Sequence, residues 1–456
     1  MPSHADGGLN GSSVLRDSAN LGLIRKLALC ALALNCVSAL LFIASVKRPV
    51  YDEPYLMVDA TRYASAGVSL STLRAHINAM GPTGLILAAL PMRVAAPDNR
   101  LTAARIAILA SWLLLGASVF VVAPRTESPE IWYVALFFAL IFPHAMTATA
   151  TLLTEGPALL FALTGSMLWV YGVSAKKLSI KSAAALFVGG FLLGVSVTCR
   201  QYYFAAVGAA ALFALYSLFQ RRSSNSTSGG WTIVVAASFL AALAPIAVLF
   251  RIWGGLSSPL SAAGSNYGVH SHLGVSLLRP VIAALCIAIY LLPFTFPFGL
   301  SRNFTRGWRA IAISAIAGIS AAIAMPQVLQ PGPIHSFVAL ADRLPWGSRI
   351  VFGALSAIAI FNAIQFVREC SRRRHEILQC PPAMFAALVV LLFMAEQFAI
   401  GGEVPFFDRY VLQIAAYLGA VVYVLAPRFI FSRYLSFAFL WGLSQFMLWR
   451  YLWVAR

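Results

Sequence analysis

The feature that most constrains the fold of this chain is a succession of apolar stretches, each roughly 20 residues long, that continues along nearly its whole length. A helix of about 20 apolar residues spans the hydrocarbon core of a bilayer and satisfies its own backbone hydrogen bonds there. We read thirteen spans, at residues 22–46, 101–123, 131–150, 157–175, 183–199, 202–219, 231–250, 280–300, 308–325, 348–367, 382–400, 411–426 and 434–454. The sequence therefore predicts an all-α, polytopic transmembrane protein in which residues 1–456 form a single domain.

Composition excludes a water-soluble protein. Hydrophobic residues make up 60% of the 456 residues, and charged residues only 11%. A soluble fold of this length could not hide so much apolar surface, because single cores stop growing at about 250–300 residues. Residues 1–20 are polar, so we expect no cleavable signal peptide and expect the first span to stay in place as an anchor.

The net charge of +18 does not indicate nucleic-acid binding, because no soluble segment gathers the basic residues on one face. With thirteen spans, the dense basic clusters fall on one side of the membrane: Arg25/Lys26, Arg125, Lys176/Lys177/Lys181, Arg221/Arg222, Arg302/Arg306/Arg309, Arg368/Arg372/Arg373/Arg374 and Arg428/Arg433. The positive-inside rule then places the N-terminus in the cytoplasm and the C-terminus outside. The same charge suits contact with anionic membrane lipids.

The first outward loop, residues 47–100, is predicted to contain helices that lie on the membrane rather than cross it. Residues 55–66 have an amphipathic pattern. Residues 82–96 are apolar, but in a helix they reach only about 22 Å, less than the ~30 Å hydrocarbon core. If they crossed, every later basic cluster would move to the outer side, so we expect a re-entrant or interfacial helix.

Asp52 and Glu53 are the first candidates for chemistry, because they follow the first span and should lie at the outer interface. Carboxylates at this depth suit the deprotonation of a hydroxyl beside a lipid headgroup. Asp-Glu-Pro is also favourable in the first turn of a helix, so a purely structural role is the alternative. The local pattern leaves both open.

Further candidates are Glu155, Arg200 with Gln201, and Arg409 with Tyr410, all beside apolar runs on the outer side. An acid so close to hydrocarbon should face protein or a water-filled cavity. An arginine can bind a phosphate with two hydrogen bonds, although Arg200 could equally form a structural pair with Glu155. Tyr410 could also be an ordinary interfacial aromatic residue.

No spacing of side chains predicts a metal site. The loop histidines have no ligand-like spacing, and the six cysteines lie in or beside apolar runs without paired spacing. The cysteines are therefore interpreted as small core residues.

Several short motifs follow one another along the chain: Tyr51-Asp52-Glu53, Thr61-Arg62-Tyr63, residues 78–85, Phe142-Pro143, Thr154-Glu155, Cys199-Arg200-Gln201 and Asp408-Arg409-Tyr410. In this order they resemble the GT-C superfamily of membrane glycosyltransferases. The most similar family is the eukaryotic alpha-1,2-glucosyltransferase family that adds the last glucose to the lipid-linked oligosaccharide. Tyr202-Tyr203 and Asn78-Ala79 depart from the Thr-Asn and Thr-Thr of that family, which leaves the sugar and the acceptor unassigned.

The resemblance implies a GT-C fold and an inverting transfer of a sugar, with a hexose expected. The donor would be a polyprenyl-phosphate sugar, and the acceptor an envelope glycan or glycolipid. The residues that it implies are catalytic Asp52 and Glu53 and substrate- or phosphate-binding Glu155, Arg200, Gln201, Arg409 and Tyr410. Asp52 would be the base, and Glu53 or Glu155 would position the acceptor or hold a divalent cation if one is used.

Two other classes of function stay open. A secondary transporter or lipid flippase would place charged residues near the bilayer midplane, whereas the acids here gather at the outer surface. A structural membrane subunit would not require the acids and arginines to converge. The low lysine content and the lack of long polar insertions indicate a bacterial inner membrane, with the site facing the periplasm.

Overall fold

The computed structural model describes residues 18–223, 229–255, 257–260, 275–299, 308–328, 332–399, 406, 408–425 and 434–454. Within these ranges the chain forms helices joined by turns and contains no strand. The helices are α1 (Ser18–Ser45), α2 (Glu53–Ala66), α3 (Leu70–Arg74), α4 (Thr83–Met92), α5 (Arg100–Val122), α6 (Pro129–Ile141), α7 (Ala145–Ala150), α8 (Glu155–Ser174), α9 (Ile180–Cys199), α10 (Phe204–Ser223), α11 (Gly229–Trp253), α13 (Leu278–Gly299), α14 (Trp308–Val328), α15 (Pro333–Val338), α16 (Gly347–Arg372), α17 (Arg374–Gln379), α18 (Pro381–Ala399), α19 (Leu412–Leu425) and α21 (Tyr434–Val454).

Among the described residues, ten helices are long and apolar enough to cross a membrane. They are α1, α5, α8, α9, α10, α11, α14, α16, α18 and α19, the last extended at its start by a 3₁₀ turn at Asp408–Val411. The prediction of an all-α, polytopic integral membrane protein is confirmed. Of the other three predicted spans, those at 280–300 and 434–454 correspond to α13 and α21, and the one at 131–150 is interrupted.

The prediction of one continuous span at residues 131–150 was wrong. Two helices, α6 and α7, occupy this segment, and the chain leaves helical conformation at Phe142 (φ −61°, ψ 144°). The next residue is Pro143, which lacks a backbone N–H and disfavours helical geometry in the residue before it. The break places His144 at the start of α7, inside the protein.

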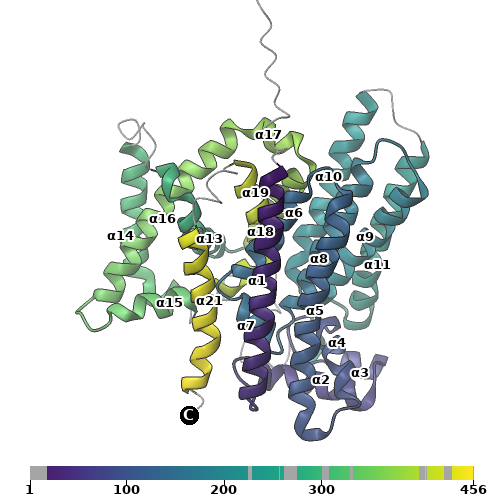
Figure 1. The fold of residues 1–456 in the computed structure, drawn as a ribbon, viewed down its shortest axis with the longest axis horizontal. Coiled ribbons are helices and arrows are strands. Elements are labelled where there is room, and N and C mark those ends of the chain that lie inside the picture. The colour runs from purple at the N-terminus through teal and green to yellow at the C-terminus, as the bar shows by residue number, and fades with distance from the viewer. Residues whose placement is uncertain are drawn as a thin grey trace, which may run out of the picture.

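The centre of the molecule is α19, which is buried along its whole length and packs against α6 and α18. A helix that is apolar on all sides is expected in such a position. Helices α8 to α11 lie together on one side of the centre, and α14, α15 and α16 lie on the other (Figure 1). Glycines allow close approach between α8, α9 and α11: a Cβ on Gly190 would lie 2.2 Å from the carbonyl oxygen of Ser238.

The two ends of the molecule differ in their elements. Helix α17 lies at one end, and α2, α3 and α4 lie at the other (Figure 1). Basic residues at the α17 end bind helix termini: Arg373 donates to the carbonyl of Leu425, and Arg221 donates to the carbonyls of Val173 and Ala175. Arg302, Arg306, Arg428 and Arg433, which are predicted for the same side, lie outside the described residues.

The segment predicted as the first outward loop contains α2, α3 and α4. The interfacial helix expected at residues 55–66 begins slightly earlier, at Glu53. Helix α4 has 10 residues, which reach about 15 Å and cannot cross a bilayer. It packs against α2, α5 and α9, so it closes the lower end of the bundle in Figure 1.

Candidate functional site

The start of α2 separates two neighbouring acids. Tyr51 has φ +58°, a left-handed conformation that is rare for a tyrosine and is often found at functional sites. The turn it makes is closed by the N–H of Glu53, which donates to the carbonyl of Val50 (3.1 Å). The next two residues begin the helix, with Pro54 in the first turn. Asp52 remains partly exposed, whereas Glu53 faces the interior of the protein.

Glu53 is fully buried and accepts four hydrogen bonds. Arg105 donates to both carboxylate oxygens, from Nε to Oε1 (2.8 Å) and from Nη2 to Oε2 (2.5 Å). The backbone N–H of Leu152 donates to Oε1 (2.8 Å), and that of Val50 donates to Oε2 (2.8 Å). This carboxylate therefore joins α2 to α5 and to the turn before α8, and its oxygens are directed at protein donors.

Asp52 forms an ion pair with Arg409, with Oδ2 2.5 Å from Nη1. Its side chain is 34% exposed, whereas that of Arg409 is 11% exposed. The Arg409 guanidinium lies 5.1 Å from the ring centre of Tyr51 and 5.7 Å from that of Tyr410. Of the two acids in the first turn of α2, only Asp52 can be approached from outside the protein.

Glu155 and Arg200 form a second, deeper ion pair between the start of α8 and the end of α9. Their side chains are 3% and 5% exposed. Oε2 of Glu155 and Nε of Arg200 are buried and have no hydrogen-bond partner within the described part of the chain. A buried polar atom without a partner costs about 1–3 kcal/mol, so these atoms mark a place where a polar ligand would be stabilised.

The two pairs belong to one cluster, because the charge of Arg409 acts on Glu155 as well as on Asp52. The order of charges is Asp52, Arg409, Glu155 and Arg200, alternating in sign. We call these four residues the charge cluster. They come from four segments of the chain that the fold brings together at the α2 and α4 end.

The start of α4 is fitted against the end of α9, next to Arg200. A Cβ on Gly81 would lie 1.9 Å from the carbonyl oxygen of Thr198, so only glycine fits there. The hydroxyls of Thr83 and Thr198 lie 2.7 Å apart. Gln201 donates from Nε2 to the carbonyl of Ala79 (2.7 Å). In this structure Gln201 therefore holds the segment before α4.

Asp59 and His76 attach α2 to the segment that follows α3. Asp59 is fully buried, accepts from Arg62 (2.6 Å) and from the side chain of Asn78 (2.7 Å), and lies 3.1 Å from Nδ1 of His76. Burial lowers the pKa of His76 below its usual range, although the charge of Asp59 acts in the opposite direction. Burial also raises the pKa of Tyr63, whose hydroxyl lies 2.9 Å from Nδ1 of His76. This network is structural.

Sequence reasoning missed Arg279, which reaches the cluster from the start of α13. It donates from Nη2 to the hydroxyl of Tyr202 (2.8 Å) and from Nε to Gln397 (2.9 Å). The rings of Tyr202 and Tyr410 have centres 4.8 Å apart, so Arg279 is linked to the aromatic residue beside Arg409. The sequence signal that could have identified Arg279 is its position at the edge of an apolar run.

A buried trio around Asp408 was also missed. His144 Nε2 lies 2.9 Å from Oδ1 of Asp408, and the hydroxyl of Tyr290 donates to Oδ2 (2.6 Å). Asp408 directly precedes Arg409, so these contacts fix the backbone from which Arg409 extends. The proline-induced break before His144 was the signal in the sequence.

The structure brings together Asp52, Glu155, Arg200, Arg409 and Tyr410. It directs Glu53 and Gln201 into packing contacts at the edge of the same region. Among the described residues, no group of three histidine, cysteine, aspartate or glutamate side chains is placed to hold a metal ion. Glu403, a further outward acid, lies outside the described residues.

No protein-family model and no curated protein matches the chain. The fold is similar to that of ArnT from Cupriavidus metallidurans in the apo state, with 15% identity and a TM-score of 0.40 over 94% of this chain and 78% of that one. The same protein bound to undecaprenyl phosphate gives 13% identity and a TM-score of 0.41 over 92% and 77%.

Proposed function

We propose that this protein is a membrane glycosyltransferase that moves a sugar from a polyprenyl-phosphate carrier to an acceptor hydroxyl at the α2 and α4 end of the molecule. The observation that carries the proposal is the convergence of two acid–arginine pairs, Asp52–Arg409 and Glu155–Arg200, from four separate segments. Such a cluster supplies a carboxylate to accept a proton and guanidinium groups to stabilise a departing phosphate.

In the proposed reaction, the acceptor oxygen attacks the anomeric carbon of the donor. The bond from that carbon to the phosphate oxygen breaks, the electron pair stays on the phosphate, and the configuration at the anomeric carbon inverts. Asp52 takes the proton from the acceptor hydroxyl, because it is the exposed acid of the charge cluster. Glu53 holds the first turn of α2 in position through its bonds to Arg105.

Arg409 changes partner in this scheme. In the structure it forms an ion pair with Asp52, which occupies one oxygen of that carboxylate. A donor phosphate beside Arg409 and Arg200 would share the guanidinium charge. This would free Asp52 to accept a proton only when the donor is bound. The same exchange would relieve the unpartnered nitrogen of Arg200.

The charge distribution supports a site outside the cytoplasm, since dense basic clusters gather at the opposite, α17 end. A bacterial inner membrane, a hexose donor and an envelope glycan or glycolipid acceptor complete the proposal. A divalent cation is not required by the scheme; within the charge cluster, Glu155 keeps an oxygen without a hydrogen-bond partner among the described residues and could bind one.

The test is release of free polyprenyl phosphate by the reconstituted protein. The protein would be offered a panel of polyprenyl-phosphate hexoses and pentoses with crude envelope as acceptor. We expect release with one donor in the wild type and a loss of roughly 10²–10⁴-fold in Asp52→Asn, because the base is removed.

Asp98→Asn is the matched control, since Asp98 is an exposed acid between α4 and α5. It should turn over like the wild type. Full activity of Asp52→Asn, or an equal loss in Asp98→Asn, would remove Asp52 from the role of base. Wild-type protein that is folded but releases no lipid phosphate from any donor would favour a transporter or flippase instead.

A further inference from the structure

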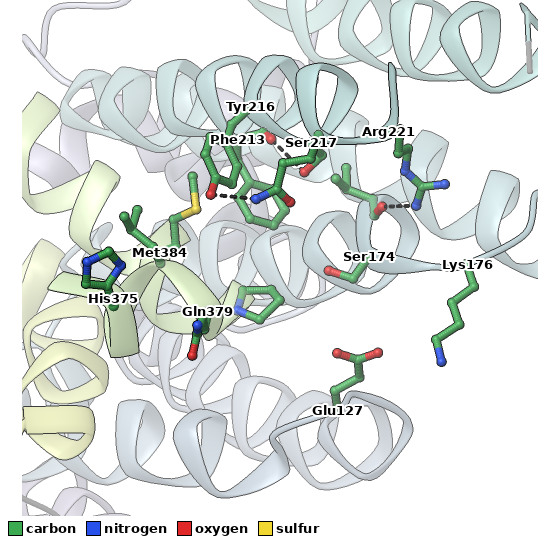
Figure 2. Close-up of a pocket in the computed structure, with 14 residues that line it drawn as sticks. Glu127, Ser174, Lys176, Phe213, Tyr216, Ser217, Arg221, His375, Gln379 and Met384 are labelled. Carbon is green, nitrogen blue, oxygen red and sulfur yellow. Dashed lines mark hydrogen bonds between the residues drawn. The ribbon is translucent and has the colours of Figure 1, made fainter. Parts of the chain in front are cut away.

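A hollow of the molecule lies far from the charge cluster. A cavity of about 790 Å³ opens between the C-terminal ends of α8 and α10, helix α17 and the start of α18 (Figure 2). Helix α8 connects the two places, because Glu155 in its first turn belongs to the charge cluster and Ser174 at its end lines the cavity. At 1.5 Å per residue they are about 28 Å apart, close to the thickness of a hydrocarbon core. We call it the α8–α17 cavity.

The rim of the α8–α17 cavity is polar and mostly basic. Lys176 and Arg221 supply cationic groups, His375 adds an imidazole, and Glu127 is the acid of the lining (Figure 2). Arg221 is held in place by its bonds to the end of α8 and by the Trp231 ring, whose centre lies 4.5 Å from the guanidinium carbon. The rim therefore presents fixed positive charge to whatever enters.

One polar atom of the wall is left for a ligand. The Oγ of Ser174 is buried and has no hydrogen-bond partner in the part of the chain that the structure describes. Lys176, two residues later, makes no ion pair with a described residue and is exposed. A hydroxyl and an ammonium group so placed can both donate to one phosphate.

The floor of the cavity is apolar. Val173, Phe213 and Met384 line it and are buried. Gln220, Gln379 and Ser217 also line the cavity, and their amide and hydroxyl groups suit ester and glycerol oxygens. The lining thus combines charged, polar and apolar groups, as in a site for an amphiphile with a phosphate at one end.

We propose that the α8–α17 cavity binds the headgroup of an anionic glycerophospholipid in the membrane leaflet at the α17 end. Lys176 and Ser174 donate to the phosphodiester, and the glycerol region rests against the apolar floor. The excess of basic over acidic groups favours an anionic over a zwitterionic lipid. The spacing along α8 places this site at the headgroup level of the leaflet opposite the charge cluster.

The test measures lipid binding by native mass spectrometry of the full-length protein in detergent. Phosphatidylglycerol, phosphatidylcholine, polyprenyl monophosphate and inorganic phosphate are each titrated. We expect phosphatidylglycerol to bind at least about fivefold more tightly than each of the other three compounds. The Lys176→Glu variant should bind phosphatidylglycerol at least about fivefold more weakly than the wild type. Lys177→Glu makes the same change of charge at the neighbouring residue, outside the lining, and should weaken binding less than about twofold.

A second variant, Ser217→Trp, fills the cavity without changing the charge and should also displace phosphatidylglycerol. Size-exclusion profiles and thermal unfolding would show that each variant is folded. Equal losses in Lys176→Glu and Lys177→Glu would mean general surface attraction and overturn the proposal. So would equal binding of phosphatidylcholine, preference for polyprenyl phosphate, or unchanged binding in Ser217→Trp. No turnover is measured, so the outcome is independent of the proposed transferase activity.

Discussion

Two adjacent carboxylates in this protein have opposite surroundings. Asp52 is one-third exposed and pairs with Arg409, whereas Glu53 is fully buried with four donors. Successive residues at the start of a helix point about 100° apart, so one can face outward while the next faces the core. Two neighbouring carboxylates therefore differ in the folded protein: Asp52 can exchange its partner, whereas Glu53 is held by its protein donors.

This difference gives a prediction for Glu53→Gln. Removing the charge leaves the buried guanidinium of Arg105 without its counter-ion, which costs about 3–5 kcal/mol. We expect thermal unfolding of the purified variant to occur at a clearly lower temperature than that of the wild type. Asp52→Asn, which changes an exposed pair, should shift the transition far less.

The double variant Glu53→Leu/Arg105→Met separates packing from charge. Replacing both members of a buried pair by apolar residues is often tolerated, so it should be more stable than Glu53→Gln. If Glu53→Gln were as stable as the wild type yet inactive, Glu53 would have a direct role in the chemistry.

The Glu155–Arg200 pair is also buried, but it is incompletely satisfied. Each side chain keeps one atom without a partner among the described residues, unlike the fully bonded Glu53. Partly satisfied buried networks are unfavourable for stability alone. We therefore propose that the donor phosphate binds near Arg200 and Arg409 rather than near Arg105.

Among the secondary-structure elements, the contact between α4 and α9 decides the position of Arg200. Gly81 sits against the backbone of Thr198, two residues before Arg200, and Gly84 sits against Thr154, next to Glu155. A short helix with one glycine just before its start and another in its first turn can approach both neighbours closely. The charge cluster thus depends on a helix that is itself too short to cross the membrane.

Gly81→Ala should disturb this contact. The added Cβ would lie 1.9 Å from the carbonyl oxygen of Thr198, so the two helices must move apart. We expect a loss of about 1–3 kcal/mol in unfolding free energy and a marked fall in transferase activity, measured by thermal unfolding and lipid-phosphate release. Gly22→Ala is the control, since a Cβ there meets nothing within 4 Å.

If Gly81→Ala behaved like Gly22→Ala in both assays, the tight fit of α4 against α9 would not position the site.

The break between α6 and α7 also positions a residue of the charge cluster. It lets His144 reach Asp408 and so fixes the residue before Arg409.

For the whole molecule, the two ends carry different chemistry. The charge cluster is at the α2 and α4 end, and basic groups and the α8–α17 cavity are at the α17 end. Ten helices of membrane-spanning length lie among the described residues between and around them. A protein built in this way keeps a fixed orientation because moving many basic groups across a bilayer is costly.

Orientation can be tested with single cysteines introduced at Asp98 or Lys177 in a background without the six native cysteines. In intact cells, an impermeant thiol reagent should label position 98 and leave position 177 unlabelled until the membrane is opened. The reason is the positive-inside distribution of charge. The reverse pattern would turn the proposed site toward the cytoplasm, and equal labelling would contradict a membrane between the two positions.

Much of this architecture follows from local sequence. Apolar runs of helical length predict an all-α, polytopic protein, because hydropathy and length act within one segment. Acids and arginines beside those runs pointed to Asp52, Glu155, Arg200 and Arg409 for a similar reason, since charge near hydrocarbon is costly wherever it occurs. Pro143 also predicts a break in the helix at its position, although the apolar residues on both sides of it look like one continuous span.

Only the tertiary structure decided which charges meet. Asp52 and Arg409 are 357 positions apart, and Glu155 and Arg200 are 45 apart, so no periodicity links them. The burial of Glu53 against Arg105, which makes it structural rather than exposed, likewise depends on how α2 packs on α5. Pairing energies depend on distance in space and on local burial, and both are set by helix packing, which no single segment of the chain encodes.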